Sequence, residues 1–153
     1  MLQRPPLSLK GRALRLLSGR EHSRFELERK LRPHEEEPGQ LARVLDELTA
    51  KGFIDEKRVA DSVVHRRASK LGAMRIRQEL QGKGLSDDLV RQAVAGLQAS
   101  ELARARELWR RKFGALPSDA AEHAKQARFL ASRGFSGEVV ARILRRKHDH
   151  ATS

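Results

Sequence analysis

The chain has no cysteine and no tyrosine, and it has only five phenylalanines and one tryptophan in 153 residues. Without cysteine it can form no disulfide and offers no thiolate for catalysis or metal binding. The scarcity of aromatic residues argues against a large β-sheet, which favours aromatic and β-branched side chains. Leucine, alanine, arginine, glutamate and lysine dominate instead, and all five favour helices. The composition therefore predicts an all-α protein.

Long apolar runs are missing as well. The first twelve residues, MLQRPPLSLKGR, are mostly polar and basic, so we expect neither a signal peptide nor a membrane anchor. No later run approaches the roughly 20 apolar residues that cross a bilayer. We therefore expect a cytoplasmic protein that makes no contact with a membrane.

Motifs for catalysis or cofactor binding are absent from the sequence. Gly82-Lys83 would need a glycine at position 77 to complete a phosphate-binding P-loop, but Arg77 stands there. There is no Gly-x-Ser-x-Gly nucleophile elbow. The histidines are dispersed, and the closest pair, His148 and His150, lies in a polar tail where solvated side chains explain them better than a metal site. We expect no enzyme activity, no cofactor and no metal.

Negative charge is in short supply. Lysine and arginine outnumber aspartate and glutamate by 32 to 20, which gives a formal net charge of +12. The excess runs along the whole chain and is largest in residues 98–153, which hold 12 basic and 6 acidic residues. Such a balance suits a polyanion or an acidic protein surface as partner. A basic surface that merely keeps the protein soluble is the alternative, and charge alone does not separate the two.

A repeat with a period of fifty residues is visible in the chain. Residues 84–90, GLSDDLV, match residues 134–140, GFSGEVV, as glycine, apolar residue, serine, free position, acid and two aliphatic residues. The glycines can end a helix with a positive φ angle, and Ser86 and Ser136 can cap the next helix with an acid in its first turn. Self-similarity at a fixed period is typical of stacked supersecondary units.

Capping and stop signals along the rest of the chain predict nine helices in three groups of three. Ser23 and Glu26 form a capping box, Asp55 and Ser100 are further N-cap candidates, and Pro117-Ser118 opens a later helix. The predicted units are residues 8–54, 55–98 and 99–148, with flexible tails at 1–7 and 149–153 and an acidic loop insertion at 33–39. Because each unit is small, we expect stacking between neighbours to supply the missing burial.

Several segments resemble the RecX family, the regulatory proteins of the RecA recombinase. They are KGFID and EKRVA at 51–60, RIRQEL at 75–80, GKGLS at 82–86, RKFG at 111–114 and ARFLASRGFS at 127–136. The agreement of their order and spacing extends from about Ala13 to Arg145. The resemblance implies three tandem three-helix repeats forming an elongated, curved array. It also implies binding along the groove of the RecA filament on single-stranded DNA, restraint of ATP hydrolysis and strand exchange, no cofactor and no catalysis. We expect a monomer with weak, salt-sensitive DNA binding of its own.

Two groups of cations are the candidate partner-binding or DNA-binding residues. The first lies in the second unit and comprises Arg66, Arg67, Lys70, Arg75, Arg77 and Lys83; the second lies in the third unit and comprises Arg110, Arg111, Arg142, Arg145 and Arg146. The alternative for the first group is a solvated face in which Arg75 pairs with Glu79 at helical spacing. The alternative for the residues at 142–146 is that cations complement the dipole at a helix C-terminus.

The few aromatic side chains are predicted to be structural. Trp109 lies at helical spacing with Leu102, Ala105 and Phe113, which favours a place in the core over stacking on a base. Phe53, Phe129 and Phe135 are interpreted in the same way.

Two other functions compete with the filament regulator. A helix-turn-helix DNA reader over residues 74–96 is disfavoured because Asp87 and Asp88 would stand where a recognition helix meets phosphates and bases. A general single-strand-binding protein would need exposed aromatic stacking platforms, of which the sequence indicates few.

Overall fold

The structure, a computed structural model, describes residues 6–145, and these residues form α-helices and one 3₁₀ helix without any strand. The elements in order are α1 (Leu9–Gly19), α2 (Arg24–Leu31), η1 (Arg32–His34), α3 (Gln40–Ala50), α4 (Glu56–Arg67), α5 (Ala73–Gly82), α6 (Asp87–Lys112), α7 (Ala120–Ser132) and α8 (Gly137–Leu144). The all-α prediction is confirmed for this part of the chain. The tail residues 1–5 and 146–153 lie outside it.

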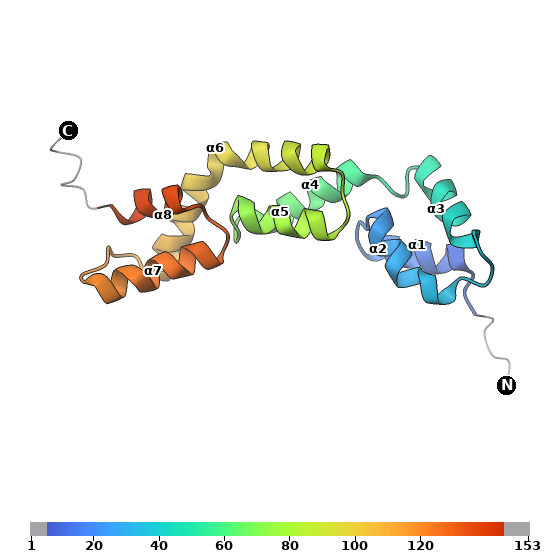
Figure 1. Ribbon diagram of the computed structural model, residues 1–153, viewed down its shortest axis with the longest axis horizontal. Coiled ribbons are helices and arrows are strands. Elements are labelled where there is room, and N and C mark those ends of the chain that lie inside the picture. Colours follow the sequence, from blue (N-terminus) through green and yellow to red (C-terminus); the bar gives the residue numbers. More distant parts are fainter. Residues whose placement is uncertain (1–5, 146–153) are drawn as a thin grey trace.

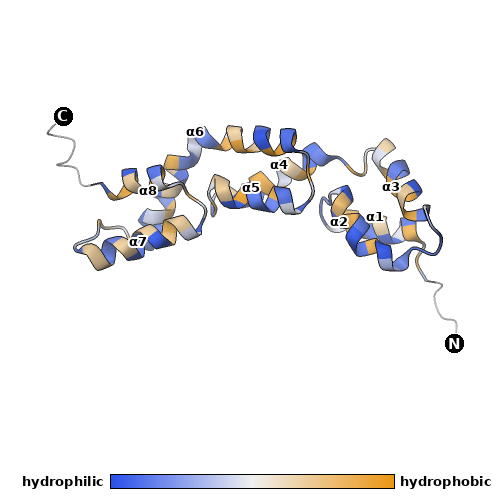
Figure 2. Cartoon of the chain, viewed as in Figure 1, coloured by the Kyte–Doolittle hydropathy of each residue, from blue (hydrophilic) through white to orange (hydrophobic). Residues whose placement is uncertain are grey.

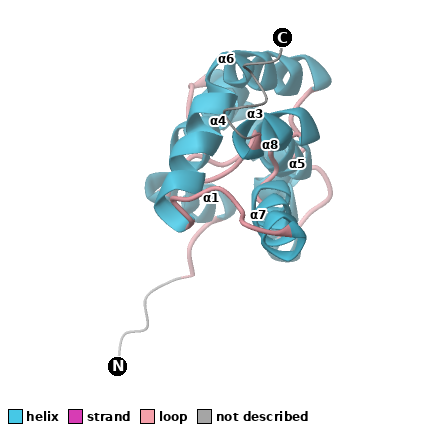
Figure 3. Ribbon diagram, turned by 90° about the vertical axis from the view of Figure 1, so that its left-hand side faces the viewer, coloured by secondary structure: helices cyan, strands magenta, loops and turns pink. Residues whose placement is uncertain are grey.

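The helices pack as three consecutive units along one long axis (Figure 1). The first unit contains α1, α2 and α3, the second contains α4, α5 and the N-terminal part of α6, and the third contains the C-terminal part of α6 with α7 and α8. A view turned by 90° looks along that axis and shows helices and loops one behind another (Figure 3). The predicted array of three three-helix repeats is confirmed.

The predicted caps start the helices at the expected places. Ser23 and Glu26 form a reciprocal capping box at α2, and Asp55 accepts a hydrogen bond from the Arg58 amide at the start of α4. In the repeated motif, Ser86 Oγ accepts from the Leu89 amide and Ser136 Oγ accepts from the Val139 amide, each at 3.2 Å. The positive-φ glycines that we predicted before these serines are also present, at +74° for Gly84 and +94° for Gly134.

The prediction of nine helices is wrong for the boundary between the second and third units. Residues 87–112 form a single helix of 26 residues, so the described residues contain eight α-helices. Ser100, predicted as an N-cap, lies inside α6, and its hydroxyl donates to the Leu97 carbonyl. The predicted boundary at residues 98–99 therefore falls within a continuous helix. Further on, the N-cap of α7 is Asp119 and not Ser118.

Each unit has a hydrophobic core of its own. Leu27, Leu45 and Leu48 centre the core of the first unit, Ile76 and Leu80 that of the second, and Ala105, Leu130 and Phe135 belong to that of the third. The apolar residues face inward within each group of helices, while polar residues cover the outside (Figure 2). The stacking between units, which we expected to add apolar burial, consists largely of polar contacts.

Both junctions between units are formed by the same kind of contact. The turn before the third helix of one unit lies against the N-terminus of the second helix of the preceding unit. At the first junction, Ser23 Oγ donates to the Lys83 carbonyl at 2.6 Å, and the Phe25 side chain lies against Gly84. At the second, the Gly72 amide donates to the Arg133 carbonyl at 2.7 Å, and the Arg75 side chain lies against Gly134. The fifty-residue repeat thus repeats the contact between neighbouring units as well as the fold of each unit.

Candidate macromolecule-binding surface

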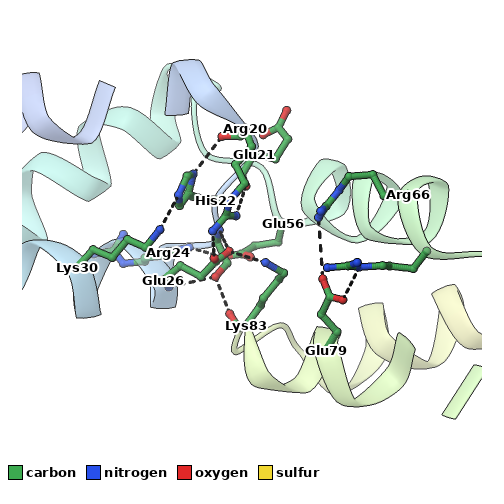
Figure 4. Close-up of polar contacts among 12 residues, drawn as sticks. Arg20, Glu21, His22, Arg24, Glu26, Lys30, Glu56, Arg66, Glu79 and Lys83 are labelled. Atoms are coloured by element: carbon green, nitrogen blue, oxygen red, sulfur yellow. Dashed lines mark hydrogen bonds and ion pairs between the residues drawn. The ribbon is translucent and has the colours of Figure 1, made fainter. Parts of the chain in front are cut away.

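Two cations of the second unit share one carboxylate. Arg67 at the end of α4 donates from Nε to Glu79 Oε1 at 3.0 Å, and Arg66 Nη2 lies 3.9 Å from Glu79 Oε2. Glu79 comes from α5, so the pair also ties these two helices together (Figure 4). Because one anion faces two guanidinium groups, the site keeps a net positive charge. Lys70 follows in the loop between α4 and α5 and is exposed.

Arg75 and Arg77 have different surroundings although they are two residues apart on α5. Arg75 Nη1 donates to the Ser132 carbonyl of α7 at 2.7 Å, so its side chain bridges the second junction. It does not pair with Glu79 as the alternative interpretation of the sequence suggested, because Glu79 faces Arg66 and Arg67 instead. Arg77 is exposed and lies beside Met74, another exposed side chain, at the edge of the second junction.

Lys83 lies inside the first junction. Its ammonium group is 3.2 Å from Glu26 Oε1, and its side chain is only 13% exposed. Arg20 Nη2 binds the other oxygen of Glu26 at 2.7 Å, and the Ser23 amide donates to Oε1 at 3.1 Å (Figure 4). Lys83 is therefore committed to a contact within the chain, and its charge is offset there.

The ionisation of the groups at the first junction follows from this arrangement. Although burial raises the pKa of Glu26, the hydrogen bonds from Arg20, Ser23 and Lys83 outweigh it and lower that pKa to about 2. Glu56, from the start of α4, shows the opposite behaviour. Burial, reinforced by the nearby carboxylates of Asp55 and Glu26, raises its pKa. Glu56 Oε1 accepts from the Arg24 amide at 3.3 Å, while Oε2 is buried without a hydrogen-bond partner within the described structure.

His22 is a buried polar residue of the first unit, 2% exposed. Its Nδ1 lies 3.0 Å from the Arg20 carbonyl and its Nε2 lies 3.2 Å from Lys30 Nζ (Figure 4). Burial lowers the pKa of His22, and the charges of Arg20 and Lys30 act in the same direction against the hydrogen bond to the carbonyl. The imidazole is therefore neutral near pH 7, with Nδ1–H donating to the carbonyl and Nε2 accepting from the lysine.

The cations of the third unit are more exposed. Arg110 and Arg111, at the end of α6, both bind Glu107, with distances of 2.7 Å from Arg110 Nη2 and 3.1 Å from Arg111 Nε. Arg142 lies on the exposed side of α8, and Arg145 directly follows that helix. Arg146, the last of the predicted cations, lies outside the described residues. Two cations again share one carboxylate, as at Glu79.

The junction between the second and third units uses polar residues that sequence reasoning missed. Glu101 is buried and accepts the Ala73 amide at 3.0 Å. Arg104 donates from Nη1 to the carbonyls of Ala68 and Leu71 at 2.7 and 2.8 Å. Both residues lie on α6 just beyond Ser100. A search for unpaired polar positions on the inner face of a continuous helix would have indicated them, but the predicted break at Ser100 concealed that face.

The aromatic residues divide between core and surface. Phe135 is buried, and Trp109 and Phe129 pack against the third core, with Trp109 Nε1 donating to Gln126 Oε1 at 2.8 Å. The prediction that Phe53 is a core residue is wrong, because its side chain is 47% exposed. Phe53 follows a positive-φ glycine, Gly52, at the end of α3, and Ile54 takes the buried place instead. Phe25, which lies at the first junction, is 41% exposed.

Exposed cations are the main feature of the described surface. Within residues 6–145, no group of three histidine or acidic side chains is placed to hold a metal ion. No helix among these residues is both long and apolar enough to cross a membrane. The chain instead presents clusters of arginine on an extended surface, each cluster only partly neutralised.

Comparison with known proteins gives a consistent result over most of the described chain. Sequence models described as the first, second and third three-helix domains of RecX match residues 10–48, 55–94 and 99–144. A regulatory protein RecX from Leptothrix cholodnii is 57% identical over 150 residues, with 96% of each chain covered. A regulatory protein RecX from Ralstonia nicotianae is 53% identical over 143 residues, covering 94% of this chain and 90% of the other.

Solved structures agree on the fold. The crystal structure of RecX from Lactobacillus salivarius superposes with a TM-score of 0.71 at 23% sequence identity, covering 89% of this chain and 92% of that one. A second crystal structure, of a regulatory protein RecX, gives a TM-score of 0.73 at 22% identity, covering 88% of this chain and 70% of the other.

Proposed function

The chain belongs to the RecX family, and from that premise we propose that it is an inhibitor of RecA that binds the RecA filament on single-stranded DNA. In this proposal it lies along the filament and slows ATP hydrolysis and strand exchange. The observation that carries the proposal is the elongated row of three units (Figure 1), together with the exposed cations of the second and third units. A long basic surface fits a repetitive polyanionic filament better than it fits a compact ligand.

We assign the contact with the filament to the cations that make no contact across a junction between units. They are Arg66, Arg67, Lys70, Arg77, Arg110, Arg111, Arg142 and Arg145. Arg75 and Lys83 act by holding the units in line, since their polar groups bind Ser132 and Glu26 of the neighbouring units. The acidic starts of α6 and α8, with Asp87, Asp88 and Glu138, argue against insertion of these helices into a DNA groove. Action on a DNA-bound recombinase implies a location in the cytoplasm.

The proposal is tested by measuring DNA-dependent ATP hydrolysis by RecA at increasing amounts of the protein. We expect hydrolysis to slow at substoichiometric protein. The double reversal Arg77→Glu with Arg142→Glu should weaken this effect by about tenfold or more. The matched control is Arg15→Glu with Arg43→Glu, which makes the same change in net charge at exposed positions of the first unit. No effect of the unaltered protein at equimolar amounts would contradict the proposal.

Binding to single-stranded DNA without RecA is a second candidate, and the exposed ring of Phe25 favours it. The Arg29 guanidinium lies 5.7 Å from the centre of this ring, a combination found where bases stack on aromatic side chains. The salt dependence of DNA binding distinguishes the two functions. We expect DNA binding by the protein alone to be weak and to disappear at high salt. Strong DNA binding that persists at high salt and is lost in Phe25→Ala would favour this second function.

A further inference from the structure

An open apolar groove runs between the last two helices of the chain. Its floor is formed by Ala127 and Ala131 of α7 and by Gly137, Ala141 and Leu144 of α8, together with Val140. The groove encloses about 720 Å³ and opens to solvent. Small residues on both helices let a third segment approach their backbones closely.

The repeat shows that this groove is larger in the third unit than its counterpart in the second, which measures about 430 Å³. At the positions fifty residues earlier, the second unit has Arg77, Gln81, Asp87 and Arg91. Their counterparts in the third unit are Ala127, Ala131, Gly137 and Ala141. The fold is the same in both units, so packing within a unit does not require small residues here. Long polar side chains, Arg77 and Gln81 among them, line the smaller groove of the second unit, whereas alanine and glycine leave a wider and more apolar groove in the third.

The edges of the groove are basic. Arg128 of α7 and Arg145 after α8 line it together with His123, and all three side chains are exposed. A segment lying in the groove would place its apolar side on the floor and its flanks beside these cations. Carboxylates on those flanks would therefore be attracted to the groove.

We propose that the α7–α8 groove binds an acidic amphipathic helix of a partner protein. In this mode an apolar face with i, i+3, i+4, i+7 spacing enters the groove, and carboxylates on its edges pair with Arg128 and Arg145. The chain's own last residues, RKHDHATS, do not fit, because they lack large apolar side chains and bring further cations. A second copy of the chain, docked groove to groove, would also bring its own Arg128 and Arg145 against these like charges. This inference does not depend on RecA being the partner.

Filling the groove tests its shape. Ala131→Gln with Ala141→Gln gives α7 and α8 the kind of side chain that Gln81 provides in the second unit, at two exposed positions. The probe is a synthetic helical peptide with leucine and alanine on one face and glutamate on its flanks, followed by the amide NMR signals of the full chain. We expect saturable shifts in α7 and α8, and affinity about tenfold weaker in the filled variant. Ala103→Gln with Ala121→Gln, at exposed positions outside the groove, should leave affinity unchanged.

Reversing the edge charges tests the chemistry of the occupant. Arg128→Glu with Arg145→Glu should abolish binding of the acidic peptide and allow binding of the same peptide with lysine in place of glutamate. Arg15→Glu with Arg106→Glu makes the same net change elsewhere on the surface and should preserve binding of the acidic peptide.

Three outcomes would overturn the proposal. The first is no saturable binding of the acidic peptide at millimolar concentration. The second is a dimer in solution that the filled variant converts to a monomer, which would assign the groove to a second copy. The third is peptide binding that occurs only after residues 146–153 are removed, which would assign the groove to the chain's own tail. RecA inhibition is measured separately and does not enter any of them.

Discussion

Gly72 and Gly134 meet at the second junction, where the backbones of two units touch. A Cβ atom built on Gly72 would lie 2.4 Å from the Gly134 carbonyl oxygen, and one on Gly134 would lie 2.7 Å from the Arg75 backbone nitrogen. Backbone atoms cannot move aside as a flexible side chain can. These two positions therefore require glycine for space, and Gly134 requires it for its positive φ as well.

We expect Gly72→Ala to lower the free energy of unfolding by about 2–3 kcal/mol, since the two units must separate to admit the methyl group. Urea unfolding followed by circular dichroism measures this change. Gly96→Ala is the matched control, because a Cβ there meets nothing within 4 Å and the residue lies inside α6. The control should stabilise the protein by about 1 kcal/mol. Equal effects of the two substitutions would contradict the close approach.

The carboxylate of Glu56 is poorly compensated within the described structure, because one of its oxygens is buried without a hydrogen-bond partner. Its raised pKa means that the folded state disfavours the ionised carboxylate, so its contribution to stability is greatest at low pH and is lost as pH rises through the folded-state pKa. We expect Glu56→Gln to raise the free energy of unfolding by about 1 kcal/mol near pH 7. The gain should vanish at pH values below the ordinary glutamate pKa.

Thermal unfolding of Glu56→Gln at pH 7 and at pH 4 measures this dependence. Glu36→Gln, in the exposed loop before α3, is the control and should change stability by less than about 0.5 kcal/mol at either pH. A loss of stability in Glu56→Gln at pH 7 would show that the ionised side chain has a stabilising role that the structure does not explain.

Single residues show where sequence reasoning succeeds and where it ends. Capping by Ser23, Ser86 and Ser136 was predictable because it depends on residues three positions away. The surroundings of Arg75 and Lys83 were not, because each side chain binds a group more than fifty residues distant in the sequence. Phe53 was misplaced for a related reason. Hydrophobicity alone does not show which of two neighbours, Phe53 or Ile54, faces the core after a turn.

At the scale of helices, α6 is the element that sequence reasoning divided wrongly. A serine followed by an acid fits the N-terminus of a helix, but this pattern does not show whether the preceding helix has ended. Between Leu97 and Glu101 there is no proline or positive-φ glycine, and the helix continues. The consequence is that the second and third units share one continuous helix, which in Figure 1 runs along the second unit and then turns into the third.

Arg104 of α6 fixes the loop between α4 and α5. We expect Arg104→Ala to cost about 2 kcal/mol of unfolding free energy, because it leaves the carbonyls of Ala68 and Leu71 without these hydrogen bonds. Urea unfolding measures this cost. Amide hydrogen exchange at Ala73, whose N–H donates to Glu101, should accelerate in the same variant.

Arg106→Ala, two residues along the same helix but exposed, is the control and should change unfolding by less than about 0.5 kcal/mol. Arg104→Lys should recover only part of the loss, since an ammonium group cannot reproduce the fork of a guanidinium. Full recovery with lysine would argue that charge, and not geometry, holds the loop.

At the scale of the whole molecule, the two junctions differ in strength. The second is crossed by α6 and by backbone hydrogen bonds from Gly72 and Met74. The first has a short linker between α3 and α4, and it is held by the side chains of Ser23, Glu26, Arg58 and Lys83. The row of units could be predicted from the repeat and the family resemblance. The difference between the junctions could not, because it arises from contacts that the repeat does not share.

The first junction should therefore open in acid before the second. The Glu26 pKa is about 2 in the folded chain, against 4.5 for an ordinary glutamate. Because the folded pKa is depressed, the stabilising contribution of this carboxylate is fully present above pH 4.5 and is lost as the pH falls toward 2. We expect the separation of the first and second units to increase and to become more variable within this window, while the helices remain folded.

Fluorescence energy transfer between labels on α3 and α5 measures this separation, with circular dichroism as the check on helix content. Glu26→Gln should give the larger separation already at pH 7 and remove its dependence on pH. Glu47→Gln is a matched control, because the Glu47 pKa is also about 2 but its hydrogen bonds come from Lys10 and Lys51 of the first unit alone. The control should keep the separation and pH dependence of the unaltered protein. If both variants behaved alike, the acid-sensitive contact would lie within the first unit and not between units.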